Sequence, residues 1–506
     1  MVFIRRKRNR SGSISIQIVH KTGALNKVIK TVGCAVGKTA IEVLEQEAEK
    51  QLRDFTKQRE LEFPFPEDQL FLEQVHLGLR EVRVIGPELI LGKLFDEVGY
   101  NQIPDFLFRQ LVITRLVYPG SKLKTVDYLL RYKGIHTNAD RIYRFMDKFN
   151  LYYKQTAIDL TFEHTKRLND YPLTVAFYDV TTLYFEASDE DDLRRIGYSK
   201  DGRNQNPQVL FALLVGLGGQ LMAFEIFSGD TYEGHTLIPV MEKFKEKYKI
   251  SSLIMVAGLL SSKNIEKLIQ LNYPFILGAR IKNKSAKMKE RILSHDYTKM
   301  KTITIQKFKD MRLIVNYAQK RAKKDEYSRQ KGLKRLEHNL KSGKLTKEKI
   351  NNRGYNKYLR IKNEIEAEID YEDFKADAKW NGLKGYMTSS DLSAQEVMDH
   401  YKQLWAIEKA FRISKTDLRF RPVFHRLEKR IKTHICIAFC SYKIQKEFER
   451  QLKMKKIDLS VTNVLNALKT IYQVNVILPK SKKCTSVLLP LDDVQKTILN
   501  AFNVNY

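Results

Sequence analysis

The sequence predicts a mixed α/β protein built around a buried sheet, and three features carry this expectation. The run PLTVAFYDVTTLYFE, which begins near Tyr171, is rich in β-branched and aromatic residues, as central strands are. The next apolar run predicts a hairpin that turns at residues 216–219. A helix, a strand, a second helix and a second strand follow. This order is typical of a mixed α/β sheet.

The composition indicates a nucleic-acid partner. The chain has 506 residues, enough for two to four domains, and 89 Lys and Arg against 59 Asp and Glu give a net charge of +30. Chains this basic most often bind polyanions, nucleic acid above all, although a merely basic surface is the alternative. Four cysteines indicate no disulfide framework. With no signal-peptide pattern and no membrane-length apolar run, we expect a cytoplasmic, nucleoid-associated protein without membrane contact.

The chain is expected to divide into six parts. Residues 1–62 predict a small α+β unit with possible DNA contact, because Ile14, Ile16 and Ile18 alternate with polar residues ahead of a helix. Residues 70–168 are a helical region whose role is either DNA binding or plain scaffolding. The remaining parts are the first half of the sheet domain, a basic β-rich insertion, the second half of the sheet domain and a C-terminal region: 171–281, 282–385, 386–450 and 451–506.

Two acids stand out against apolar surroundings. Asp179 lies within the strand FYDVTT, and Glu408 lies on the apolar stripe of a helix predicted from Ser393 to about Leu418. A carboxylate on a buried face needs a cation, a metal ion or a donor. A strand Asp with a distant helix Glu is the arrangement that holds divalent cations for phosphoryl transfer. The alternatives are a hydrogen-bonded strand-end Asp and a Glu at the stripe edge.

The spacing Tyr401-x2-Leu404-x3-Glu408-x6-Lys415 resembles the Tyr-x2-Arg-x3-Glu-x6-Lys signature of a large branch of bacterial insertion-sequence transposases. These are DDE enzymes with a ribonuclease H-like catalytic fold. YDVTTLYFE is similar to their first-Asp strand, and further similar segments are RNRSGSIS, GYSKDGRNQNPQV, FSGDTYEGHTL, KGYMTS and IEKAFRISKTDLRFRPVFH. The resemblance implies a ribonuclease H-like mixed sheet with helices, interrupted by the basic insertion and preceded by the α+β unit and the helical region.

The resemblance also implies roles for particular residues. Asp179 and Glu408 would be catalytic metal ligands for Mg²⁺ or Mn²⁺, while Tyr401, Arg412 and Lys415 would contact the DNA end. The substrates would be double-stranded DNA, namely the terminal inverted repeats of the element and the target, bound by a homodimer. Two tryptophans could stack on an unpaired base. Of these, Trp380 stays open, whereas Trp405 is expected in the core.

Two positions depart from the family pattern. Leu404 replaces the Arg of the signature, and Val256 occupies the end of the strand SSLIMVAG, where the second catalytic Asp is expected. Valine cannot bind a cation, and the sequence gives no geometric reason to let Asp230 or Glu233 replace it. We therefore expect a DNA transposase that cuts element ends and joins them to target DNA, with impaired activity in this chain. The alternatives are a catalytically inactive DNA-binding protein derived from a transposase and a structure-specific nuclease of the same fold.

Overall fold

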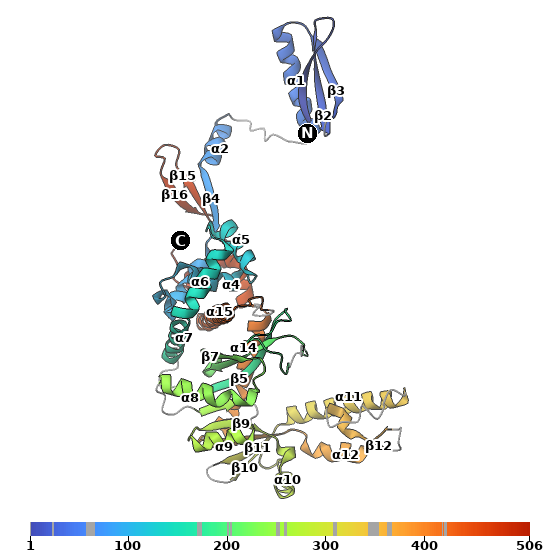
Figure 1. Cartoon of the computed structure of the whole chain (residues 1–506), viewed down its shortest axis with the longest axis vertical. Helices are drawn as coiled ribbons and strands as arrows, with labels where there is room; N and C mark the ends of the chain where they lie inside the picture. Colours follow the sequence, from blue (N-terminus) through green and yellow to red (C-terminus); the bar gives the residue numbers. More distant parts are fainter. Residues whose placement is uncertain are drawn as a thin grey trace. The chain divides into compact units, whose positions relative to one another are not determined.

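The structure is a computed structural model (Figure 1), and it describes residues 2–22, 25–56, 66–168, 175–199, 202, 205–248, 254–257, 261–306, 311–342, 354–361, 367–416, 418 and 423–505. The chain forms two compact units. The first comprises Met1–Arg80 with Val476–Thr485, and the second comprises Glu81–Asn475 with Ser486–Tyr506. The division into six parts made from the sequence stays a prediction.

The first unit contains an antiparallel three-stranded sheet with the order β1-β2-β3, and helix α1 packs against it. Ile16 and Ile18 are fully buried there, as predicted, but Ser15, Gln17 and Val19 are buried as well, so burial does not alternate along β2. Strand β1 was not predicted, because four of its seven residues are Arg or Lys, and these basic side chains hide the strand pattern. The elements are β1 (Val2–Arg8), β2 (Ile14–Thr22), β3 (Leu25–Ala35), α1 (Lys38–Thr56) and α2 (Pro66–Gly78).

The second unit contains an eight-stranded sheet with the order β10-β11-β14-β9-β8-β5-β6-β7. Strand β8 is parallel to both of its neighbours, β5 and β9, and the other pairs are antiparallel, so the predicted mixed sheet is present. Strands β10 and β11 extend this sheet, although the sequence assigned them to the insertion. The strands are β5 (Val175–Tyr184), β6 (Gln208–Val215), β7 (Leu221–Ser228), β8 (Ile254–Ala257), β9 (Phe275–Ala279), β10 (Thr302–Gln306), β11 (Arg312–Tyr317) and β14 (Leu383–Thr388).

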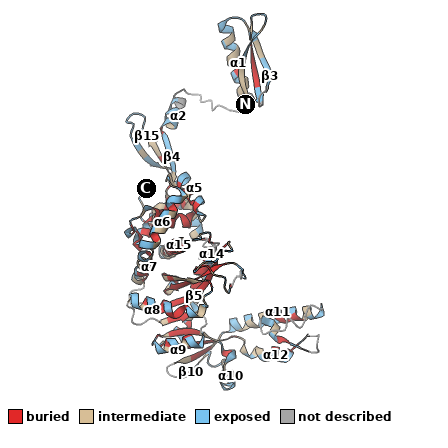
Figure 2. Cartoon of the chain, in the orientation of Figure 1, coloured by how far each residue is buried: buried red, intermediate tan, exposed pale blue. Residues whose placement is uncertain are grey.

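Alternate residues of β5 face two different cores. Val175 and Phe177 belong to the larger core, which includes residues of α14 and α15, whereas Ala176 and Tyr178 belong to a second core with residues of α8. Figure 2 shows the buried residues gathered around β5 and in the helices around α15. The helices concerned are α8 (Leu237–Tyr248), α9 (Ser262–Gln270), α13 (Ala394–Lys402), α14 (Leu404–Thr416) and α15 (Glu428–Met454).

Helix α15 is the central element of the helical part. It packs against α3, α4, α6 and α7, and its Cys436 and Cys440 are buried free thiols, as expected for core cysteines. The helices around it are α3 (Lys93–Val98), α4 (Phe106–Val117), α5 (Lys122–Lys133), α6 (Ala139–Tyr152), α7 (Lys154–Leu168) and α16 (Val461–Leu468). Residues expected as a helical region therefore share one core with a helix that follows the sheet in the chain.

The remaining elements of the chain include α11, which carries Arg321 of the site described below. The long basic stretch after β11 is helical, as predicted, in α11. A two-stranded sheet pairs β12 with β13, and a further sheet has the order β16-β15-β4. These elements are α10 (Ala286–Leu293), α11 (Gln319–Lys341), β12 (Leu359–Ile361), β13 (Ala367–Ile369), α12 (Tyr371–Ala376), β4 (Leu79–Val84), β15 (Tyr472–Ile477), β16 (Cys484–Leu488) and α17 (Asp493–Ala501).

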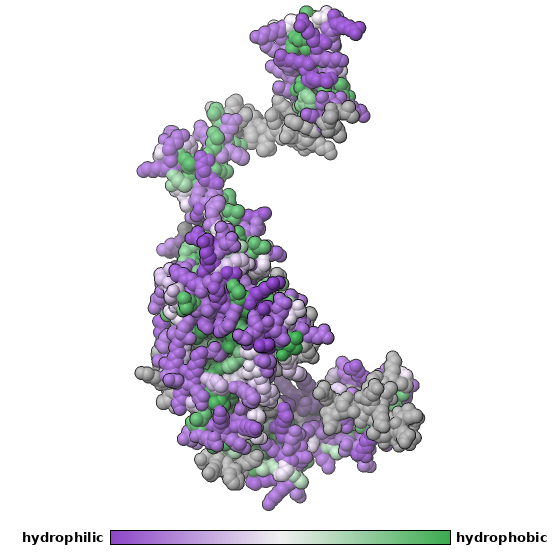
Figure 3. All heavy atoms as spheres, viewed as in Figure 1, coloured by the Kyte–Doolittle hydropathy of each residue, from purple (hydrophilic) through white to green (hydrophobic). Residues whose placement is uncertain are grey.

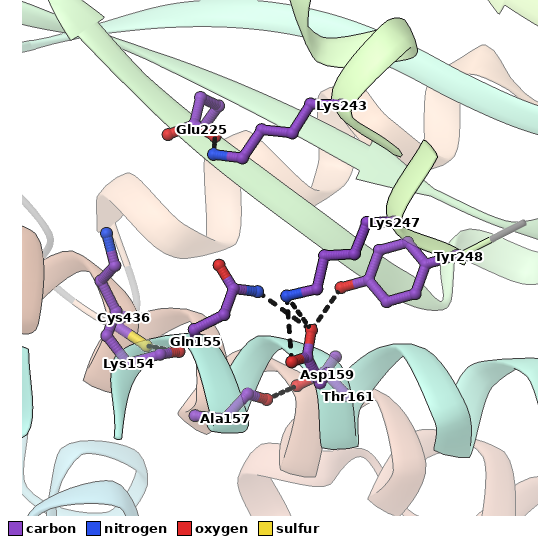
Figure 4. A network of polar contacts seen from close by, with 10 residues as sticks. All are labelled: Lys154, Gln155, Ala157, Asp159, Thr161, Glu225, Lys243, Lys247, Tyr248 and Cys436. Carbon is purple, nitrogen blue, oxygen red and sulfur yellow. Dashed lines mark hydrogen bonds and ion pairs between the residues drawn. The ribbon is translucent and has the colours of Figure 1, made fainter. Parts of the chain in front are cut away.

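A polar network joins helix α7 to helix α8 beside the sheet (Figure 4). The carboxylate of Asp159 accepts hydrogen bonds from Gln155 Nε2 at 2.9 Å and from the Tyr248 hydroxyl at 2.7 Å, and it pairs with Lys247 Nζ at 2.7 Å. Lys243 pairs with Glu225 of β7. These contacts fix the helical part against the edge of the sheet that β7 forms.

The face of the protein drawn in Figure 3 is mostly polar. Figure 3 shows one face that is mostly hydrophilic, with small scattered hydrophobic areas. Among the described residues, no helix combines the length and the apolar character that crossing a membrane requires.

Lys443 is a fully buried lysine of α15. Its ammonium group donates to Thr165 Oγ1 of α7 at 2.7 Å and to Gln220 Oε1 at 3.3 Å. Burial lowers the pKa of Lys443 to about 7, although the charge of Glu447 acts in the opposite direction. The folded protein therefore releases this proton at a lower pH than the unfolded chain does.

We predict that stability rises with pH between about 7 and 10.5 through Lys443, because the unfolded state binds more protons across that window. Lys443→Met should lower the slope of the unfolding free energy against pH by about 1.4 kcal/mol per pH unit at most. Urea denaturation followed by circular dichroism at several pH values measures it. Lys453→Met, on an exposed position of the same helix, should keep the wild-type slope, and equal slopes in all three proteins would contradict the prediction.

Candidate active site

Asp179 lies in the middle of β5, between buried neighbours, and its own side chain is half-buried. It lines an open cavity of about 740 Å³. The same cavity is lined by Tyr401 of α13, by Arg280, and by Asp230 and Glu233 from the segment between β7 and α8. The strand Asp and the helix Tyr that the sequence singled out, more than two hundred residues apart, therefore border one cavity.

The predicted helix from Ser393 to about Leu418 is two helices, α13 and α14, which meet at Gln403. The capping box of Ser393 and Glu396 is present at the start of α13, as predicted. Gln403 closes α13 with a bond from its backbone N–H to the His400 carbonyl, and its side-chain oxygen accepts from the Gly218 N–H at 3.4 Å. The prediction of one continuous helix with a single apolar stripe is therefore wrong.

The break changes which side of α14 is buried. Glu408 is exposed and not on a buried face, and Trp405 is 60% exposed and not in the core, so both expectations were wrong. Ile407, Ala410 and Phe411 form the buried side, and the Phe411 ring packs against Phe211 of β6 at 6.0 Å. Trp405, Glu408 and Arg412 follow one another at spacings of three and four residues and share the exposed side.

Helix α14 packs directly against β5, which carries Asp179 (Figure 1). Arg412 is exposed on the helix and has a partner within the protein. Lys415 lies on α14, but its side chain is outside the described residues.

Tyr401 is held by an aromatic and a cationic contact. Its ring meets Tyr386 of β14 edge-on at 5.1 Å, and Lys384 Nζ lies 4.3 Å from the Tyr401 ring centroid. Burial and the negative charge of Glu408 raise the pKa of Tyr401, while Arg321 opposes the rise. Burial and Arg321 lower the pKa of Lys384, and Glu408 opposes that shift. Glu408 is thus within electrostatic reach of Tyr401 and Lys384.

Two of these residues were missed by reasoning from the sequence. Lys384 begins the segment KGYMTS, which is part of the family resemblance. Its position next to Tyr401, however, depends on how β14 pairs within the sheet, which the sequence does not show. Arg321 comes from the long basic stretch, where nothing distinguishes it from its neighbours. Trp380 is half-buried and packs at the edge of a small core around β10 and β11.

Val256 is fully buried in β8, and in the parallel ladder it is the partner of Phe177 of β5. Side chains alternate along a strand, so Val256 faces the same side of the sheet as Phe177 and Asp179. Strand spacing and rise put its Cα roughly 8 Å from that of Asp179. The position where the sequence predicts a second carboxylate therefore lies on the Asp179 side of the sheet, and an apolar side chain that packs in the core occupies it.

The acids present do not make a complete metal site. In the part of the chain that the structure describes, no three His, Cys, Asp or Glu side chains lie close enough together to hold a metal ion. Asp230 borders the Asp179 cavity, but it is exposed and accepts a hydrogen bond from Ser228 Oγ at 2.6 Å. With Val256 in place, the residues do not fit the three-carboxylate set.

A family model described as the Transposase DDE domain matches residues 170–444, more than half of the chain. The chain belongs to the DDE transposase family. The match covers the β5 Asp, Val256 and the Glu of α14, and the large mixed sheet is compatible with a ribonuclease H-like transposase fold. DDE transposases act on DNA as nucleases and transesterases and generally use divalent metal ions. No curated protein matches the chain.

We predict opposite responses from two neighbours on α14. Trp405→Ala should change the free energy of unfolding by less than about 0.5 kcal/mol, as exposed substitutions do. Ile407→Ala, at a position only 1% exposed, should lower it by about 2–5 kcal/mol. Urea denaturation followed by circular dichroism measures both. A Trp405→Ala variant that loses as much stability as Ile407→Ala would put Trp405 in the core and turn Glu408 inward.

Proposed function

We propose that this chain is the DNA transposase of a bacterial insertion sequence, which binds the ends of its element but cuts them poorly because of Val256. One observation carries the proposal. Asp179 borders the same cavity as Tyr401, and α14, which carries Glu408, packs on the Asp179 strand, while the neighbouring strand offers the buried Val256 instead of a third acid.

The proposed roles of the residues follow the family pattern. Asp179 and Glu408 are the proposed catalytic acids, and Tyr401, Arg412 and Lys415 are the proposed contacts to the DNA end. The exposure of Glu408 and Arg412 on one side of α14 supports DNA access to both. Trp405, exposed on that same side, is available to stack on an unpaired base.

The proposed substrates are double-stranded DNA at the terminal inverted repeats of the element and in the target. A net charge of +30 supports phosphate binding over large areas of the protein. Bringing two ends together calls for a dimer on DNA. Mg²⁺ or Mn²⁺ is the proposed ion for a chain with three acids, and Val256 leaves that set of ligands incomplete in this chain.

The second candidate function is DNA binding without catalysis, by a protein derived from a transposase. Full burial of Val256 among apolar residues favours it, because a side chain so placed contributes to stability and not to chemistry. The two candidates differ only in whether the chain cuts.

We predict that Val256→Asp increases magnesium-dependent nicking of a labelled duplex that carries the terminal repeat. A metal ion stabilises the transition state by several kcal/mol, so the increase should be about 100-fold or more. Gel analysis of the cut strand, for the natural protein and the variant side by side, measures it. Asp179→Asn in the Val256→Asp background should abolish the gain.

The substitution buries a carboxylate, so its folding has to be tested separately. Val256→Asn introduces a polar side chain of the same size as that of Val256→Asp, but without the negative charge that binds a metal ion. It should fold as Val256→Asp does and stay inactive. Equal cutting by the natural protein and by Val256→Asp would refute the role given to Val256. If folded Val256→Asp binds the ends without cutting, the DNA-binding function is favoured. If neither protein binds DNA, both functions fail.

A further inference from the structure

A second cavity, of about 410 Å³, lies in the helical part of the second unit and shares no lining residue with the Asp179 cavity. It is lined by residues from the four helices α4, α5, α6 and α15, from the turn that precedes α5 and from the segment between α14 and α15. The residues that matter below are Arg115, Ser121, Lys122, Phe424, His425 and His434.

Two cations of this cavity are buried, and no described residue serves as their counter-ion. Arg115 and Lys122 are only 5% and 7% exposed. Arg115 donates to the Gly120 carbonyl at 3.2 Å and lies 3.1 Å from His434 Nδ1. Among the described residues, no carboxylate forms an ion pair with either cation, and no hydrogen bond from the Lys122 ammonium group is present.

The cavity carries an excess of positive charge, and the pKa values of Arg115, Lys122 and His425 are lowered. Burial lowers the pKa of Arg115 to about 10, and burial together with Arg115 lowers the pKa of Lys122 well below its ordinary value. Burial, with Lys122, Arg115 and Arg430, lowers the pKa of His425 to about 3. Within the described part of the chain, no carboxylate is among the causes of these shifts.

Arg430, a cation whose charge reaches the same cavity, has a carboxylate partner. Arg430, whose charge also reaches His425, donates to both carboxylate oxygens of Asp147, at 2.9 and 3.0 Å. A buried charge without a partner is strongly destabilising, so cations are normally paired in this way. Among the described residues, Arg115 and Lys122 have no carboxylate placed as Asp147 is for Arg430.

The start of helix α5 adds to the positive field. Lys122 is the first residue of this 12-residue helix, and Ser121 caps it by accepting a hydrogen bond from the Lys124 N–H at 3.2 Å. The amino end of a helix carries a partial positive charge and unbonded N–H groups, which suit a bound anion. Buried cations, a helix start and an open volume therefore converge on one place, and no acid is among the described residues that line it.

We propose that this cavity binds a phosphate group carried by a nucleic-acid strand. Arg115 offers a planar donor fork that matches phosphate geometry, and Lys122 offers a point charge. Phe424, on the rim, is 72% exposed and presents a ring on which a base can stack. The volume suits a group of nucleotide size.

The strand as the source of the phosphate rests on the proposed function, whereas binding of phosphate itself does not. The same donors would accept free phosphate, so the two sources need separate measurements. The variant to use is Lys122→Met, which removes the cation without a bonded partner and keeps an unbranched side chain. Arg131→Met is the matched control, because it removes one positive charge from a 70% exposed side chain of the same helix.

The first measurement is the melting temperature of the full chain in sodium phosphate and in sodium chloride of equal ionic strength. We expect a saturable rise in phosphate for the natural protein and for Arg131→Met, and no such rise for Lys122→Met. In phosphate-free buffer, Lys122→Met should melt at or above the temperature of the natural protein, because a buried unpaired charge is gone. A lower melting temperature in that buffer, with an unchanged phosphate response, would overturn the inference.

The second measurement is fluorescence anisotropy of a short labelled duplex at several salt concentrations. If a DNA phosphate occupies the cavity, Lys122→Met should bind about tenfold more weakly than Arg131→Met, and with a shallower salt dependence. If Lys122→Met loses only the response to inorganic phosphate, free phosphate is the ligand. No loss in either measurement refutes the cavity as a phosphate site. A natural protein that binds no DNA but responds to phosphate refutes the proposed function alone.

Discussion

The parallel pairing of β5 with β8 is the constraint on which the rest of the site depends. It sets Phe177 beside Val256 and so puts Asp179 and Val256 on one side of the sheet, against which α14 and α15 pack. A carboxylate at Val256 would be buried, and it would be tolerated only with a cation beside it. The valine removes that demand for a cation and adds apolar packing. In our proposal, the valine exchanges a ligand position for core stability without changing the sheet that carries it.

The sheet could be predicted from the sequence more easily than the helix beside it. The strands from Tyr171 onward are long apolar runs. They can be recognised as strands even when the order in which they pair is not known. The side of α14 that faces the core depends on a one-residue break at Gln403, which no periodicity predicts. A continuous helix puts Glu408 and Trp405 on the buried stripe, whereas the actual break exposes both. The joining of β10 and β11 to the main sheet was equally hidden, because it arises from pairing with β14, some seventy residues later.

The buried cations show how much of a site depends on contacts between distant parts of the chain. Lys443 donates to Thr165 and Gln220, and Arg430 pairs with Asp147, so each has compensation from another element. Arg115 and Lys122 form no ion pair with any acid that the structure describes, and the residues that surround them come from positions about three hundred apart. The sequence places a basic turn before α5, but it cannot tell a solvated lysine from one that faces a cavity.

The central claim is that this transposase lacks one carboxylate of an otherwise preserved site. Binding of Mn²⁺ to the free protein, measured by the loss of its electron paramagnetic resonance signal, tests it without any need for the DNA sequence of the element. The account predicts saturable binding of Mn²⁺ to Val256→Asp that is lost when Asp179→Asn is added, and no such binding to the natural protein over the same concentration range. Saturable binding to the natural protein that disappears in Asp179→Asn would contradict the account, because another residue would then complete the site.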